Sequence, residues 1–425
     1  MESSSSESSV KARSNRRVDV LGELLLLIAL PPFTYYLWLC VTDFGGAFAF
    51  PLSISEWRDL FSRIPGPSVT AVIIYGGWFL FQAALQVAAP GTIHHGVPLA
   101  DGTRLQYKMN GWSSFWFTIA VASLACWLQW IPATIIYDEF GPLLTTANIF
   151  AFAFSVFLYL SGKASARPER RTGNALSDYF MGTALNPRVG AFDLKLFCES
   201  RPGLILWVLV NLSCAAKQYE LHGRVTTPMI LVNAFQFLYV ADYFFHEGAI
   251  LTTWDIKHEN FGWMLCWGDL VWVPFTYTLQ AAYLVNHTHE LPAAAIAAIV
   301  ALNMTGYAIF RGANLQKHTF RKTPHALAWG KPAKYIQTSQ GQRLLVSGWW
   351  GIARHANYFG DLLMALAWCL PTGFEHPLPY FYFVYFTILL VHREWRDNAR
   401  CREKYRDDWD AYCRKVPSRI VPGVY

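Results

Sequence analysis

Hydrophobic residues gather along this chain in long runs, separated by shorter polar or charged segments. A helix needs roughly 20 mostly apolar residues to cross the hydrocarbon core of a bilayer. By that criterion the pattern predicts about ten membrane spans, near residues 20–42, 68–90, 112–131, 140–161, 203–223, 226–247, 263–285, 293–312, 357–371 and 377–392. The expected fold class is an all-α polytopic integral membrane protein.

The segment before the first run has a different composition. Residues 1–19 are rich in serine and then basic, with few side chains to bury, so we expect a disordered tail. Residues 20–425 are expected to form one membrane domain, because no low-complexity segment or internal repeat divides them.

Composition and charge support a membrane location and fix an orientation. Only 15% of residues are charged, against about 25% in soluble domains. If the N-terminus is cytoplasmic, 31 of the 35 Lys and Arg residues fall on the cytoplasmic side of the predicted spans or at their cytoplasmic ends. Retention of basic residues in the cytoplasm produces this asymmetry. Both termini are therefore expected to be cytoplasmic, and the net charge of +6 does not indicate nucleic-acid binding.

Ionisable residues inside predicted spans are costly in a membrane and point to function. On a helix, Tyr239, Tyr243 and Glu247 share one face at intervals of four residues, and Asp242 and His246 form an adjacent pair. This face is either a polar interface within the helix bundle or the wall of a buried pocket.

Two cations at the end of the eighth span form a second candidate. Lys317 and Arg321 are four residues apart and point the same way on a helix. They either extend to lipid headgroups or bind a phosphate, for which the arginine fork is suited. No G-x-G-x-x-G or P-loop pattern occurs, so any nucleotide is not held by a Rossmann unit.

The C-terminal segment carries the densest chemistry. Read as a helix, one stripe holds His392, Arg396, Arg400 and Lys404, and the next holds Arg393, Asp397, Cys401 and Tyr405. A solvated helix carries such charges without any function. Their position directly after a predicted span, with the Trp349-Trp350 and Asn357-Tyr358 pairs upstream, favours a binding site.

At these residues the chain resembles the sterol reductase family, which includes sterol C14-reductases, 7-dehydrocholesterol reductase and the membrane domain of the lamin B receptor. The terminal family signature, roughly LLxHRxxRDxxxCxxKYG, is matched from Leu389 to Tyr405, with Arg406 in place of the glycine. A second signature is matched from Asp242 to Thr278. The segment GTALNPRVGAF is most similar to the C14-reductases.

The resemblance implies a function and a set of site residues. It implies NADPH-dependent reduction of a sterol double bond, C14=C15 in preference to the Δ7 bond, with the sterol taken from the bilayer of the endoplasmic reticulum or a bacterial inner membrane. A cytoplasm-facing pocket within about 293–425 would hold the cofactor. Its implied residues are Lys317, Arg321, Leu345, Trp350, Asn357, Tyr358, Asp397, Cys401, Arg402, Glu403, Lys404, Tyr405 and Tyr412. Tyr239 and Asp397 would be catalytic.

The chemistry of the reaction agrees with this assignment. An isolated alkene does not accept hydride until it is protonated, so the protein must supply an acid and a surface that stabilises a cation. Tyr239 and Asp397 are the donor candidates, with His392 and Glu247 after them. Asp397 would alternatively orient the cofactor or stabilise the cation as a carboxylate.

Other readings compete with a reductase. The segment Arg354 to Gly360 resembles the RHPxYxG motif of isoprenylcysteine carboxyl methyltransferases, although Ala356 replaces its proline. A sterol-binding scaffold and a transporter are the non-enzymatic alternatives. No metal site is expected, since the eight cysteines form no C-x-x-C pair and His287 and His289 offer only two ligands.

Overall fold

The computed structural model describes residues 2–99, 102–164, 171–323 and 325–425, with side chains from residue 20 onward. The chain divides into two compact units. The first comprises Met1–Val225 and Gln236–Thr288, and the second comprises Thr226–Phe235 and His289–Tyr425. Side chains of residues 2–19 lie outside this description, so the predicted disorder of the tail stays a prediction.

The first unit is built mainly of helices. In chain order these are α1 (Glu2–Thr42), α2 (Ile54–Ser62), α3 (Val69–Ala88), α4 (Gly111–Trp127), α5 (Ile135–Asp138), α6 (Phe140–Ala164), α7 (Ala175–Met181), α8 (Leu194–His222), η2 (Glu247–Thr252), α10 (Trp254–His258), α11 (Trp263–Trp267), η3 (Gly268–Trp272), α12 (Val273–Thr276) and α13 (Leu279–Leu284). Helix α9 (Thr227–Phe245) begins in the second unit and ends in the first.

Local sequence explains where α8 begins and ends. The Asp193 side chain accepts a hydrogen bond of 2.9 Å from the backbone N–H of Leu196, which caps the first turn. Gly223 ends the helix in the left-handed conformation, with φ of 69°, that a side chain disfavours. This cap places Lys195 and Glu199 on the first turns of a 29-residue helix.

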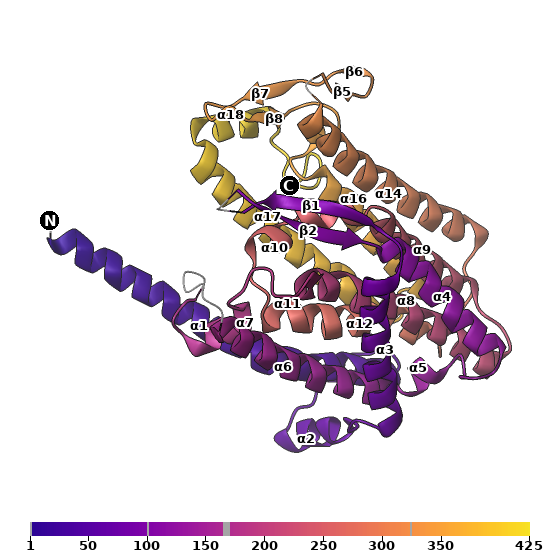
Figure 1. Cartoon of the computed structure of the whole chain (residues 1–425). Helices are drawn as coiled ribbons and strands as arrows, with labels where there is room; N and C mark the ends of the chain where they lie inside the picture. Colours follow the sequence, from indigo (N-terminus) through magenta and orange to yellow (C-terminus); the bar gives the residue numbers. More distant parts are fainter. Residues whose placement is uncertain (1, 100–101, 165–170, 324) are drawn as a thin grey trace. The chain divides into compact units, whose positions relative to one another are not determined.

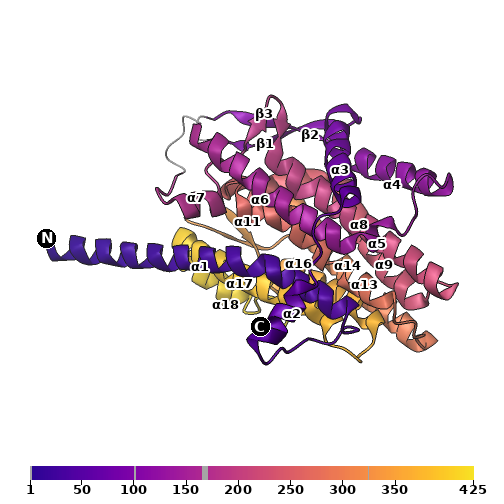
Figure 2. The same ribbon diagram turned by 90° about the horizontal axis from the view of Figure 1, so that it is seen from below.

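Aromatic side chains join the long helices of the first unit. Helix α3 crosses α6 in the views of Figures 1 and 2. The Phe79 ring centroid on α3 lies 4.6 Å from that of Phe150 on α6 and 5.2 Å from that of Phe197 on α8. Rings at these separations contribute beyond the area that they bury.

The second unit contains the predicted cofactor half of the chain. Its helices after α9 are α14 (Ala293–Lys322), α15 (Trp349–Ile352), α16 (Ala356–Cys369), η4 (Leu370–Thr372), η5 (Leu378–Tyr380), α17 (Phe381–Tyr405) and α18 (Asp407–Lys415). Helices α14 and α16 lie side by side (Figure 1). A Cβ atom on Gly306 of α14 would lie 2.7 Å from the Gly360 carbonyl oxygen of α16, so these glycines permit the close approach.

Among the described residues, five helices are long and apolar enough to cross a membrane: Val20–Thr42, Val69–Ala88, Phe140–Ala164, Thr227–Phe245 and Ala293–Lys322. They coincide with the first, second, fourth, sixth and eighth predicted spans. Helices α4, α8, α16 and α17 occupy the positions predicted for four more. The predicted total of about ten spans stays a prediction.

Two features of the fold differ from the sequence-based expectation. The all-α prediction omitted four two-stranded sheets within the described residues: β1 (Thr92–Pro98) with β2 (Arg104–Met109), β3 (Arg188–Val189) with β4 (Phe192–Asp193), β5 (Leu327–Ala328) with β6 (Lys331–Pro332), and β7 (Tyr335–Gln337) with β8 (Arg343–Leu345). All are antiparallel hairpins in segments between the predicted spans.

The second difference is the seventh predicted span, 263–285, which is not one continuous α-helix. It changes into a π-helix at Gly268–Trp272 and continues through Pro274. A Cβ on Gly203 of α8 would overlap the Asp269 carbonyl oxygen. The backbone of α8 therefore approaches this segment closely, at the point where its helical geometry changes.

Candidate functional site

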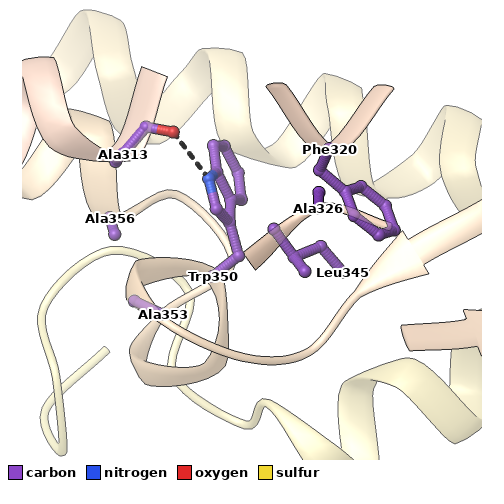
Figure 3. Close-up of a cluster of buried hydrophobic side chains, with 7 residues drawn as sticks. All are labelled: Ala313, Phe320, Ala326, Leu345, Trp350, Ala353 and Ala356. Atoms are coloured by element: carbon purple, nitrogen blue, oxygen red, sulfur yellow. Dashed lines mark hydrogen bonds between the residues drawn. The ribbon is translucent and has the colours of Figure 1, made fainter. Parts of the chain in front are cut away.

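Lys317 and Trp350 form the centre of the candidate site in the second unit. The Trp350 indole N–H donates a hydrogen bond of 2.8 Å to the Ala313 carbonyl oxygen, and its ring packs beside Leu345 (Figure 3). Lys317, one turn after Ala313 on α14, places Nζ 3.7 Å from the centroid of the Trp350 ring. The cation thus lies on an aromatic face fixed by a backbone hydrogen bond.

Arg321 follows Lys317 by one turn and is exposed. Helix α14 extends ten residues beyond the predicted end of its span, to Lys322, so both cations belong to a formed helix. Two cations four residues apart on one helix are a suitable arrangement for a phosphate.

Asn357 and Tyr358 lie at the start of α16. The Asn357 Nδ2 donates to Asn314 Oδ1 at 3.3 Å, whereas its Oδ1 is buried with no hydrogen-bond partner among the described residues. The Tyr358 ring stacks on His355, with centroids 4.7 Å apart and planes at 16°. An amide oxygen without a partner is available to a ligand that carries a donor.

His355 links this segment to Asp397. Its Nε2 lies 3.7 Å from Asp397 Oδ2 on α17. Burial lowers the pKa of His355 to about 3, and the nearby cations of Lys317, Arg354 and Arg393 add to the shift. The imidazole is therefore neutral at physiological pH and does not form a charged pair with Asp397.

Cys401 lies one turn after Asp397, with Sγ 3.9 Å from Asp397 Oδ2. Burial first, and the charge of Asp397 second, raise the pKa of the Cys401 thiol to about 12. The thiol keeps its proton, so Asp397 is flanked by two neutral groups, the Cys401 thiol and the His355 imidazole.

The hairpin of β7 and β8 connects the rest of the site. The Gln342 Oε1 accepts from Lys404 Nζ at 2.8 Å and from the Tyr405 hydroxyl at 2.5 Å. On β8, Leu345 packs in the cluster of Trp350, while its neighbour Leu344 packs in the cluster of Tyr412. Because side chains alternate along a strand, the hairpin contacts both groups.

Not every predicted cofactor residue joins this arrangement. Tyr412 does join it, because its buried ring stacks on Trp409, with centroids 4.9 Å apart, in a cluster against which Cys401 and Tyr405 pack. Arg402 is exposed and pairs with Asp410 at 3.2 Å. Glu403 is exposed as well. The structure gives no sign that Arg402 and Glu403 face the remaining candidates.

Tyr239, the other predicted catalytic residue, lies in the first unit on α9. Its ring centroid is 6.2 Å from that of Trp207, whose ring contacts Tyr277 edge-on at 5.2 Å. The Trp207 indole N–H donates to Gln236 Oε1 at 2.7 Å. Tyr239 therefore belongs to a group of aromatic rings held by a buried hydrogen bond.

Glu247 and His392, the donor candidates considered after Tyr239 and Asp397, have different surroundings. Glu247 is buried, pairs with Arg201 at 2.8 Å and accepts from the Gly111 backbone N–H at 2.8 Å. His392 is exposed on α17.

Sequence reasoning did not single out His355 or Gln342. His355 lies in the Arg354-to-Gly360 segment, which was considered only for its resemblance to a methyltransferase motif. Gln342 carries no pattern, because its role depends on the hairpin that brings it to Lys404 and Tyr405.

The residues present suit a nicotinamide dinucleotide. The Lys317 and Arg321 cations suit phosphate, the buried aromatic rings suit planar bases, and the Asn357 Oδ1 without a partner suits an amide donor.

Comparison with known proteins gives a consistent result. The sequence profile of the ergosterol biosynthesis ERG4/ERG24 family matches residues 15–425 of this chain. A protein named delta(14)-sterol reductase from Methylotuvimicrobium alcaliphilum is 60% identical over 98% of this chain and 99% of its own length. A delta(14)-sterol reductase from Dictyostelium discoideum is 46% identical over 97% of this chain and 92% of its own. A 7-dehydrocholesterol reductase from Xenopus laevis is 41% identical over 95% of this chain and 92% of its own length.

Proposed function

This chain belongs to the ergosterol biosynthesis ERG4/ERG24 family, and from that membership we propose that it reduces the C14=C15 double bond of a sterol with NADPH. The observation that carries the choice of bond is the 60% identity over nearly the full length to a delta(14)-sterol reductase. The protein is an oxidoreductase of sterol biosynthesis and an integral membrane protein, so its substrate comes from the bilayer.

Protonation comes first in the reaction. An acid delivers a proton to C15, the π electrons form the new C–H bond, and a tertiary cation remains at C14. Tyr239 is the proposed acid. The rings of Trp207 and Tyr277 near it offer π surface of the kind that stabilises a cation without accepting its charge.

The cofactor is held by the second unit. Lys317 and Arg321 bind the 2′-phosphate that distinguishes NADPH from NADH, while Trp350 and Tyr358 offer ring faces. When bound, NADPH supplies the hydride that completes the reduction. The His355 imidazole and the Cys401 thiol contact the Asp397 side chain and hold it in position, from which it would orient the cofactor.

Orientation follows from the charge distribution. With 31 of 35 basic residues on one side of the predicted spans, we place both termini and the cofactor pocket in the cytoplasm. The membrane is the endoplasmic reticulum in a eukaryotic cell and the inner membrane in a bacterium.

The direct test is an assay of the purified protein on a Δ8,14-sterol and a Δ7-sterol, with NADPH or NADH, analysed by mass spectrometry. We expect loss of the C14=C15 bond with NADPH, and little reaction of the Δ7-sterol. Preferential reduction of the Δ7-sterol would favour the activity named for the Xenopus relative.

Replacing Lys317 and Arg321 together by alanine tests whether these two residues make the protein prefer NADPH to NADH. The double variant should lose affinity for NADPH and keep its affinity for NADH, since only NADPH carries the 2′-phosphate. Equal losses for both cofactors would mean that the two residues only anchor α14.

A further inference from the structure

Three polar side chains of the first unit each have a buried oxygen atom without the hydrogen-bond partner that such groups normally have. Within the described residues, Glu199 Oε1, Asp269 Oδ2 and the Tyr243 hydroxyl are inaccessible to solvent and have no hydrogen-bond partner. Buried polar groups are nearly always hydrogen-bonded. None of the three takes part in the proposed protonation and hydride transfer.

Their elements bring the three groups together. Glu199 lies on α8, Asp269 on the π-helix and Tyr243 on α9. The missing Cβ of Gly203, one turn after Glu199, lets α8 approach the Asp269 backbone. Electrostatic interactions join Asp269 to Glu199. Tyr243 interacts with Glu247 first, and also with Glu199, Arg201 and Asp269. A π-helix of this kind is often found at a functional site.

The charges near the two carboxyl groups do not balance if both are ionised. Lys195, one turn before Glu199, is fully buried and donates to the carbonyl oxygens of Asp255, Ile256 and Glu259 at 2.6, 3.2 and 2.8 Å. Its ammonium is the cation that interacts with both Glu199 and Asp269. One cation compensates one carboxylate, and a second ionised carboxylate would be buried at high cost.

Other charges near the pair do not change this balance. The Asp193 carboxylate is paired with Arg188 at 2.9 Å, and Glu247 is paired with Arg201. Burial raises the pKa of Glu199, Lys195 opposes the rise, and Asp255 and Asp193 add to it. At least one of the Glu199 and Asp269 carboxyl groups therefore keeps a proton at neutral pH.

This proton is close to the proposed acid. Tyr243 lies one helical turn from Tyr239 on the same face of α9, where side chains four residues apart are neighbours. Glu199 lies just before the predicted span 203–223, at the end expected to face the cytoplasm. The groups thus lead from that side of the membrane toward Tyr239.

We propose that the Glu199–Asp269 pair stores the proton that recharges Tyr239 after each turnover, with Tyr243 as the carrier between them. This inference rests on the proposed function, because it needs Tyr239 as the acid. After Tyr239 has given its proton to the sterol, its phenolate takes the Tyr243 proton. Tyr243 then takes the proton of the carboxyl pair, which is refilled by water from the cytoplasmic side.

The test separates the first turnover from later ones. Enzyme is loaded with sterol and NADPH, and product is measured during one turnover and at steady state. Tyr243→Phe removes only the hydroxyl of the proposed proton carrier. Glu199→Gln and Asp269→Asn each remove one carboxyl group of the pair that stores the proton. Tyr107→Phe is the matched control, because Tyr107 is buried in the same cluster that Tyr243 packs against.

The relay predicts that each of the three variants keeps the wild-type rate in the first turnover, when Tyr239 is already protonated. At steady state each should slow by about 10²-fold, the low end of the effect of a positioned proton-transfer group. Tyr107→Phe should match the wild type in both phases. If Asp269→Asn fails to fold, the Tyr243→Phe and Glu199→Gln variants still test the relay.

Two results would overturn the relay while leaving the proposed function intact. One is wild-type behaviour of Tyr243→Phe in both phases. The other is equal slowing of the first and later turnovers, which indicates a merely structural role. The proposed acid itself fails on a different observation, a Tyr239→Phe variant that retains the wild-type rate in the first turnover.

Discussion

Asp397 shows how neighbouring residues define the role of a single side chain. Its carboxylate lies 3.7 Å from the imidazole of His355 and 3.9 Å from the thiol of Cys401. Both groups are neutral at pH 7, because the pKa of His355 is lowered to about 3 and that of Cys401 is raised to about 12. Neither group gives Asp397 a proton readily, so we expect Asp397 to position the cofactor.

The division of roles between Tyr239 and Asp397 is testable by two isosteric changes. Tyr239→Phe keeps the ring that contacts Trp207 and removes the acidic hydroxyl. It should slow turnover at least about 10²-fold, with the NADPH dissociation constant unchanged. Asp397→Asn should raise that dissociation constant as well as slow turnover. Near-normal turnover of the Phe variant would exclude Tyr239 as the acid and return Asp397 to that role.

Among the elements, the α14–α16 pair supports the proposed cofactor site, since α14 carries Lys317 and α16 carries Asn357. The two helices meet through glycines. A Cβ on Gly306 would lie 2.7 Å from the Gly360 carbonyl oxygen, and one on Gly360 would lie 2.5 Å from the Phe310 backbone nitrogen. These contacts are with backbone atoms, so they are not relieved by turning a side chain.

We therefore expect Gly306→Ala to destabilise the protein by about 1–3 kcal/mol, the usual cost of overpacking, and to weaken NADPH binding. Gly76→Ala on α3 is the matched control, because a Cβ there meets nothing within 4 Å. Thermal unfolding in detergent measures both variants. Equal stability of the two would mean that α14 and α16 do not need the glycine contact.

The elements also show what the sequence allows one to predict. Uniformly apolar runs such as 140–161 lead directly to single helices, because the membrane demands internal hydrogen bonding. The break at Gly268–Trp272 coincides with the close approach of Gly203 from another helix, which no local pattern reveals. The same holds at the site: Lys317 and Arg321 are visible as a spacing, whereas the contact of His355 with Asp397 exists only after folding.

For the whole molecule, the distribution of Lys and Arg residues predicts how the protein is oriented in the membrane. The basic residues of 162–201 and of 322–345 fall on the side predicted to be cytoplasmic, together with both termini. Accessibility tags at these four places should all report the cytoplasm, and a tag within 43–67 should report the opposite side. An external 162–201 segment would contradict both the span count and the orientation.

The central claim is that this protein protonates C15 of a Δ8,14-sterol and delivers hydride to C14. The most direct measurement is the position of deuterium in the product of two parallel reactions. One reaction uses NADPH deuterated at both C4 positions in ordinary water, and the other uses unlabelled NADPH in D₂O. We predict deuterium at C14 from the cofactor and at C15 from the solvent. Cofactor deuterium at C15, or an unlabelled C14 in the first reaction, would contradict the account.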